Sequence, residues 1–124
     1  MEKDNIYDIL IQSIMLVASS YQIQTNTLPT YVNVADEICL IYNDAYLMIP
    51  QIKDKSLISS KAMSMLKELN KLFDEMSDDK MLWTLEKLKE DNNWEKTRKL
   101  SHEILKELNE PYKRPNLDFI NWVK

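Results

Sequence analysis

Hydrophobic residues recur at helical spacing along most of this chain. Over residues 5–23, apolar side chains fall at every third or fourth position from Ile6 to Tyr21, with polar side chains between them. A period near 3.6 residues is typical of an amphipathic helix. The same period runs through residues 60–76, where Lys and Glu on the opposite face are spaced to pair. The pattern predicts helices over both ranges. Further apolar residues widen the apolar face of the first helix, which we expect to be largely enclosed: Ile9, Ile11, Met15 and Leu16.

Residues 33–48 show a different pattern, because apolar side chains occupy nearly every side of the predicted helix. One face holds Val34, Ile38, Ile41, Ala45 and Met48. Leu40 and Leu47 fall on the opposite face. A helix that is apolar all round usually lies in the middle of a bundle. We therefore expect a largely buried second helix that begins at Asn33 and ends before Pro50.

The C-terminal half predicts two more helices and a folded tail. Thr84 can cap a short fourth helix, and Asn92 with Glu95 resembles a capping box for a fifth over residues 93–108. From Glu110 the chain contains two prolines and then a run rich in apolar residues, too apolar for a free end. The sequence predicts an all-α protein: residues 1–124 form a single domain, one bundle of five or six helices with a docked C-terminal tail.

The sequence contains no glycine, which changes both the local structure and the chemistry that we expect. Asparagine is the next-best residue for the left-handed backbone at a helix end, and we expect such ends near Asn26, Asn70 and Asn109. A dinucleotide-binding fingerprint, a Walker A loop and a GxSxG nucleophile elbow all require glycine. These three classes of site are therefore excluded.

Candidate catalytic and metal-binding residues are few. The chain has one cysteine, Cys39, and one histidine, His102, so it forms neither an intrachain disulfide nor a His–Cys metal cluster. Cys39 lies between two apolar residues, which favours a structural role. His102 has only charged neighbours at helical spacing, which predicts a solvated surface: Arg98, Lys99, Glu103 and Lys106. We expect no catalytic residue, no cofactor and no metal, and therefore a protein that is not an enzyme.

The location of the charge is more informative. The net charge is −4, which disfavours nucleic acid as a partner. Residues 4–52 contain five acidic residues and no Lys or Arg, whereas residues 57–124 contain thirteen of each sign. The longest apolar run is far too short to span a membrane and the N-terminus does not resemble a secretory signal, so we expect a cytoplasmic protein.

Acidic residues interleaved with tyrosines are typical of a surface that binds a basic protein. The candidate partner-binding residues are Tyr31, Asp36, Glu37, Tyr42, Asp44 and Tyr46, with Trp122 in the tail as a further anchor. The alternative remains open. The acids can stabilise helix N-termini through the helix dipole, and the tyrosines can belong to the core.

Two parts of the chain carry a resemblance to a known class of proteins. They are Leu82-Trp83-Thr84-Leu85-Glu86 followed by Trp94-Glu95 and Arg98, and the stretch from Tyr31-Val32 to Tyr42-Asn43-Asp44. The chain resembles small helical bacterial immunity proteins of polymorphic toxin or contact-dependent growth inhibition systems. The resemblance implies a protein that binds and occludes one cognate toxin, often a basic nuclease such as an EndoU-type ribonuclease. The alternative function is a small structural or regulatory adaptor protein of phage origin.

Overall fold

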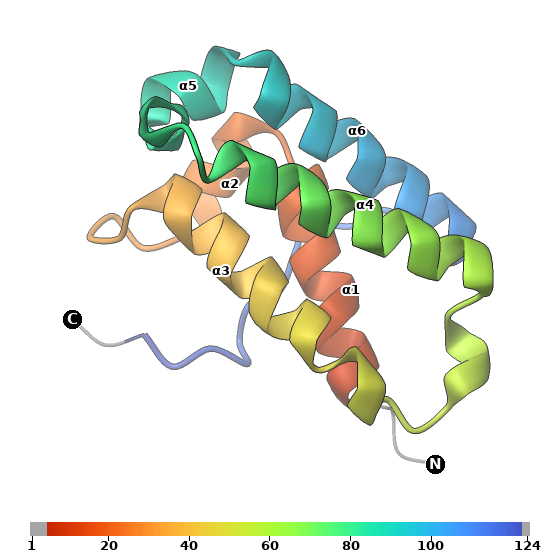
Figure 1. Cartoon of the computed structure of the whole chain (residues 1–124). Coiled ribbons are helices and arrows are strands. Elements are labelled where there is room, and N and C mark those ends of the chain that lie inside the picture. The colour runs from red at the N-terminus through yellow and green to blue at the C-terminus, as the bar shows by residue number, and fades with distance from the viewer. Residues whose placement is uncertain (1–4, 123–124) are drawn as a thin grey trace.

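The computed structural model describes residues 5–122, which form six α-helices and three short 3₁₀ helices with no strand (Figure 1). The α-helices are α1 (Asn5–Ala18), α2 (Tyr21–Thr27), α3 (Val34–Leu47), α4 (Ser60–Met76), α5 (Leu85–Glu90) and α6 (Asn92–Glu107). The 3₁₀ helices are η1 (Ile49–Gln51), η2 (Lys55–Leu57) and η3 (Lys80–Trp83). This confirms the all-α bundle. Asp4, the first of the five acids in residues 4–52, lies outside the described residues.

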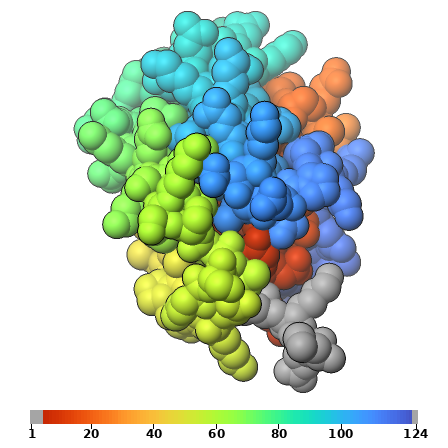
Figure 2. Space-filling model, turned by 90° about the vertical axis from the view of Figure 1, so that its right-hand side faces the viewer, coloured from red at the N-terminus to blue at the C-terminus, as the bar shows by residue number. Residues whose placement is uncertain are grey.

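Helix α1 is the central element of the bundle. It packs against α3 on one side and α6 on the other (Figure 1). In the side view only a small part of α1, in red, reaches the surface (Figure 2). Its buried residues are Leu10, Ile11, Ser13, Ile14, Met15, Leu16, Val17 and Ala18. The enclosed first helix expected from the sequence is therefore confirmed.

The first helix is, however, shorter than predicted. It ends at Ala18, and a separate helix α2 starts at Tyr21, so the single helix over residues 5–23 is wrong. Ser20 explains part of the break, because its Oγ accepts a hydrogen bond from the N–H of Ile23 at 3.2 Å and caps α2. Hydrophobic periodicity continues across a break of two residues, so it does not reveal this cap.

Helix α3 has its predicted start and end but not its predicted burial. Asn33 caps it, accepting a hydrogen bond from the N–H of Asp36 at 3.1 Å. Leu40 and Leu47 are 52% and 64% exposed, so the expectation of a largely buried second helix is wrong. Helices α1, α4 and α5 pack against α3, and its buried residues are Val34, Ala35, Ile38, Ile41, Tyr42 and Ala45. An apolar pattern does not tell whether enough neighbours exist to cover both sides of a helix.

Helix α4 matches its predicted bounds. The two helices that follow each begin at a side-chain cap. Thr84 caps α5 as predicted, accepting from the N–H of Lys87 at 3.2 Å. The cap of α6 is Asp91, not Asn92, because the Asp91 carboxylate accepts from the N–H of Asn93 at 2.8 Å. The predicted capping box is therefore wrong, because the cap lies one residue earlier and the third helical position is then Trp94, not Glu95.

Of the three asparagines expected at helix ends, one has that role. Asn109 follows α6 with a φ of 58°, the left-handed backbone that glycine usually supplies. Asn26 and Asn70 instead lie inside α2 and α4.

The C-terminal tail is docked, as predicted. Leu117 and Pro115 are buried, and Ile120 packs against the core. Polar contacts join the tail to α1 and to Ser19 just after it. Tyr7 Oη donates to Glu110 at 2.9 Å, Ser19 Oγ lies 2.8 Å from Tyr112 Oη, and the N–H of Asn116 donates to Gln12 Oε1 at 2.8 Å. The tail thus helps to cover the central helix.

Candidate partner-binding surface

The outer face of α3 combines exposed acidic and exposed leucine side chains. Asp36, Leu40, Asp44 and Leu47 are all exposed, and their spacing of four, four and three residues aligns them along one side of the helix. We call these four residues the α3 stripe. Residues 34–47 include no Lys or Arg, so the stripe has no positive neighbour on its own helix.

The other predicted residues lie in different surroundings. Tyr31 precedes α3 and is 47% exposed, whereas Glu37 and Tyr46 are half-buried. Trp122 is half-buried too, and it lines a shallow hollow with Thr27 and Leu117 that is separate from the stripe. Their role in binding stays a prediction.

Tyr42 is the clear correction among the predicted residues. Its exposed fraction is zero, and its hydroxyl donates to the carbonyl of Leu66 in α4 at 2.7 Å. Its ring lies between those of Tyr46 and Phe73, at centroid distances of 6.0 and 5.8 Å. Because burial also disfavours the phenolate, the pKa of Tyr42 is raised. Tyr42 is therefore a core residue and its ring is not available to a partner.

Trp83 and Trp94 both belong to the core of the bundle. Trp94 is fully buried, and half-buried Trp83 meets it edge to face at a centroid distance of 5.2 Å. Both indole N–H groups are satisfied by backbone carbonyls, Trp83 by that of Met76 at 3.1 Å and Trp94 by that of Leu82 at 2.7 Å. The pair fixes η3 and α6 together.

Neither Cys39 nor His102 has surroundings that would activate it. Cys39 is half-buried, and its thiol pKa is raised from 9.0 to about 11, chiefly by burial and further by the charges of Asp36 and Asp74. The thiol therefore stays protonated at neutral pH, in the form that is a poor nucleophile. His102 is exposed, as predicted, and its ring lies 5.2 Å from that of Tyr112. No cluster of three or more metal-ligand side chains occurs among residues 5–122.

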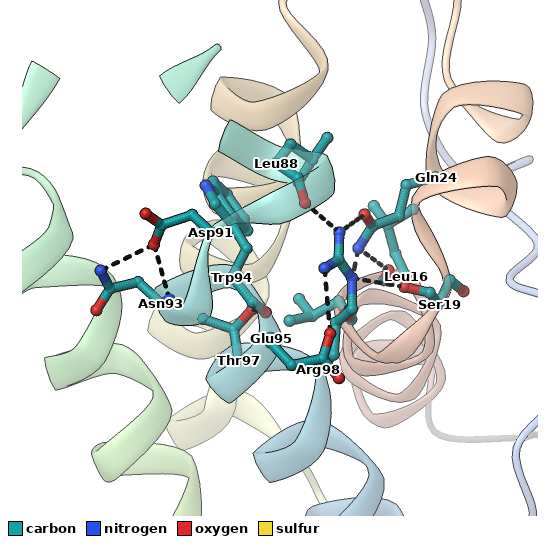
Figure 3. Close-up of polar contacts among 11 residues, drawn as sticks. Leu16, Ser19, Gln24, Leu88, Asp91, Asn93, Trp94, Glu95, Thr97 and Arg98 are labelled. Carbon is teal, nitrogen blue, oxygen red and sulfur yellow. Dashed lines mark hydrogen bonds and ion pairs between the residues drawn. The ribbon is translucent and has the colours of Figure 1, made fainter. Parts of the chain in front are cut away.

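The polar cluster that sequence reasoning missed is centred on Arg98. The sequence predicts a solvated Arg98, yet this side chain is only 7% exposed, so that expectation is wrong. Its guanidinium donates to the carbonyl of Ser19 at 3.2 Å, to Gln24 Oε1 at 2.9 Å and to the carbonyl of Leu88 at 2.7 Å (Figure 3). Glu95 adds an ion pair at 3.7 Å.

This cluster supplies hydrogen bonds to backbone carbonyls at the break between α1 and α2. Gln24 is fully buried and donates to the carbonyls of Leu16 and Val17, which belong to the last turn of α1 and otherwise lack part of their helical bonding. Burial lowers the pKa of the Arg98 guanidinium, and Glu95 opposes that effect. The burial of Arg98 could have been predicted from its spacing, because it lies four residues after the buried Trp94 and therefore on the same helix face. Arg98 and Gln24 are buried and their hydrogen bonds link α1, α2, α5 and α6, so the role of the cluster is structural.

The fold and its surface define an all-α bundle with one acidic, partly apolar helix face exposed. No protein-family model, no curated protein and no solved structure matches the chain. No helix within residues 5–122 has the length and apolar character needed to cross a membrane.

Proposed function

We propose that this chain is a non-enzymatic protein-binding domain whose α3 stripe binds a basic protein. The observation that carries the proposal is the alternation of exposed Leu40 and Leu47 with exposed Asp36 and Asp44 on one helix face. Single exposed leucines are common on protein surfaces. Two leucines aligned with two acids that form no ion pair within residues 5–122 are typical of an interface, where apolar contact gives affinity and charge steers the encounter.

A second copy of the chain fits this stripe poorly. Two α3 stripes packed together would bring four aspartates into one interface, with no basic residue from either helix. Like charges brought together at an interface cost free energy. A basic partner avoids that cost, and each of its cations would face an aspartate across the stripe.

We further propose that the partner is a toxin, and that the chain is its immunity protein in the bacterial cytoplasm. The cleft of a nuclease presents a positive field to the phosphates of its substrate. The stripe extends over eleven residue steps, about 16 Å of helix, which is long enough to cover such a cleft. Inhibition would then be stoichiometric occlusion: the helix occupies the place of the nucleic acid. An EndoU-type ribonuclease is the candidate toxin, because the resemblance of the sequence includes partners of that kind.

The test begins with a toxin domain encoded beside the gene for this chain. We expect an equimolar complex in which RNA cleavage by the toxin is lost. If the chain instead binds no basic protein and copurifies stably with a structural or regulatory assembly, the immunity proposal is refuted and the adaptor function replaces it.

A matched pair of variants tests the surface. Replacing Asp36, Glu37 and Asp44 together by their amides should slow association and flatten its dependence on salt, because exposed charges are screened beyond about 8–10 Å at physiological ionic strength. The control replaces Glu68, Glu75 and Glu103, exposed acids of α4 and α6, by glutamine. Stopped-flow association at several salt concentrations separates the two. Equal rates and salt slopes for both variants would refute the assignment to α3.

A further inference from the structure

At the C-terminal end of α3 the chain turns through η1 and η2 into α4 and encloses a groove of about 570 Å³. Volumes of this order accommodate a drug-sized ligand or a few side chains. The apolar part of the lining is Tyr46, Leu47, Ile49, Pro50, Ile52, Ile58 and Met63. We call this the α3–α4 groove. Leu47 lies at its edge and is also the last residue of the α3 stripe, so the stripe and the groove form one continuous surface.

The charge at this groove is opposite in sign to that of the stripe. Lys55 and Lys67 both line it, and neither forms an ion pair with a carboxylate of the described residues. Lys55 Nζ donates to the carbonyl of Pro50 at 2.6 Å, which holds its ammonium at the groove. Asp54 is the one acid in the lining, so the two lysines leave the lining with a net positive charge. Its carboxylate accepts from the N–H and the hydroxyl of Ser56 at 3.0 and 2.6 Å.

The N-terminal end of α4 adds to this positive character. Ser59 and Ser60, at the start of this 17-residue helix, line the groove, and the first turn contains no acidic residue. The positive end of the helix dipole is therefore not neutralised by its own side chains. An apolar floor with two lysines and a helix N-terminus around it complements an apolar group that carries a negative charge.

We infer that the α3–α4 groove seats an apolar side chain of the partner that has a carboxylate next to it. This inference rests on the protein-binding role proposed above and specifies its chemistry. The partner would place basic residues over Asp36 and Asp44, and an apolar residue with an acidic neighbour in the groove. Anchors that fill a pocket contribute most of the affinity of an interface. Adjacent regions of opposite charge would fix the direction in which the partner lies along α3.

The groove can be tested without the partner, using three small probes. N-acetyl-leucine carries a carboxylate, N-acetyl-leucine amide is neutral, and leucine amide is a cation. In methyl-resolved NMR titrations, the Ile58 and Met63 signals should shift saturably. The carboxylate probe should bind about two- to fivefold more tightly than the neutral one, as expected for a partly exposed ion pair, and the cation most weakly.

Replacing Lys55 and Lys67 by glutamine should remove the preference for the carboxylate. The matched control replaces Lys71 and Lys99, which line a hollow between α4 and α6, and should leave it unchanged. Absence of saturable shifts, or equal binding of the cation, would overturn the inference. It would also be overturned if dilution of the protein alone moved the same signals, because the groove would then hold a second copy.

Once the partner is identified, Leu47→Ser and Met63→Ser should each raise the dissociation rate of the complex about tenfold or more. The association rate should stay unchanged. Leu47 is 64% exposed, so its variant keeps the test valid if Met63→Ser is unstable. The variant in which Asp36, Glu37 and Asp44 are replaced by amides should do the opposite, slowing association and leaving the dissociation rate nearly unchanged. If the partner binds and neither groove variant changes dissociation, the groove inference fails while the binding role stands. If no basic partner binds, the binding role fails and the probe titrations still decide what the groove accepts.

Discussion

Replacing Arg98 by methionine should strongly destabilise the protein. Methionine keeps much of the buried aliphatic volume but removes every donor, leaving the Oε1 of Gln24 and the carbonyls of Ser19 and Leu88 without the guanidinium. Hydrogen bonds to charged groups contribute about 1.5–3 kcal/mol each, so three amount to roughly 6 kcal/mol. The variant no longer buries a charge, and that relief offsets roughly half of the loss. The expected net loss is about 3 kcal/mol in the free energy of unfolding.

Urea denaturation followed by circular dichroism at 222 nm measures this loss directly. Gln24→Leu combined with Arg98→Met completes a double-mutant cycle, and the double variant should be about 1–2 kcal/mol more stable than the sum of the single losses predicts. Arg98→Lys should rescue only in part, because an ammonium does not reproduce the fork of the guanidinium. A loss below about 1 kcal/mol for Arg98→Met, or an additive cycle, would contradict the structural role given to this cluster.

Three smaller predictions concern residues that the sequence marked as candidates. Cys39 should react with a thiol reagent at pH 8 about 100-fold more slowly in the native protein than in urea, because a thiol pKa raised from 9.0 to about 11 leaves that much less thiolate; equal rates would show that the thiol is not shielded. Tyr42→Phe should cost about 1 kcal/mol in thermal or urea unfolding, since it removes a buried hydroxyl bonded to the carbonyl of Leu66, and no loss would mean that this bond contributes nothing. His102→Ala should change stability by less than about 0.5 kcal/mol and leave binding of the proposed partner unchanged, as expected for an exposed side chain. Loss of function in a folded His102→Ala variant would contradict the non-enzymatic proposal.

The sequence by itself determined the class of fold and several of its local features. The 3.6-residue period, the caps at Asn33 and Thr84, and the left-handed backbone at Asn109 are local properties. Each depends on residues within a few positions of one another, so the pattern of side chains is enough to predict them. The apolar tail was predicted to dock for the equally general reason that such a segment is poorly solvated.

Only the tertiary structure decided what is buried and what remains a surface. Tyr42 and Leu40 are neighbours on one apolar-rich helix, yet Tyr42 faces α4 and Leu40 faces solvent, because the helices that pack against α3 cover Tyr42 and leave Leu40 exposed. Arg98 is a surface residue by type, but its guanidinium meets the carbonyl of Ser19, just after α1, and that of Leu88 near the end of α5. The α3–α4 groove likewise joins residues of α3, η1, η2 and α4. Burial and shared surfaces depend on which helices meet, and periodicity within one segment does not contain that information.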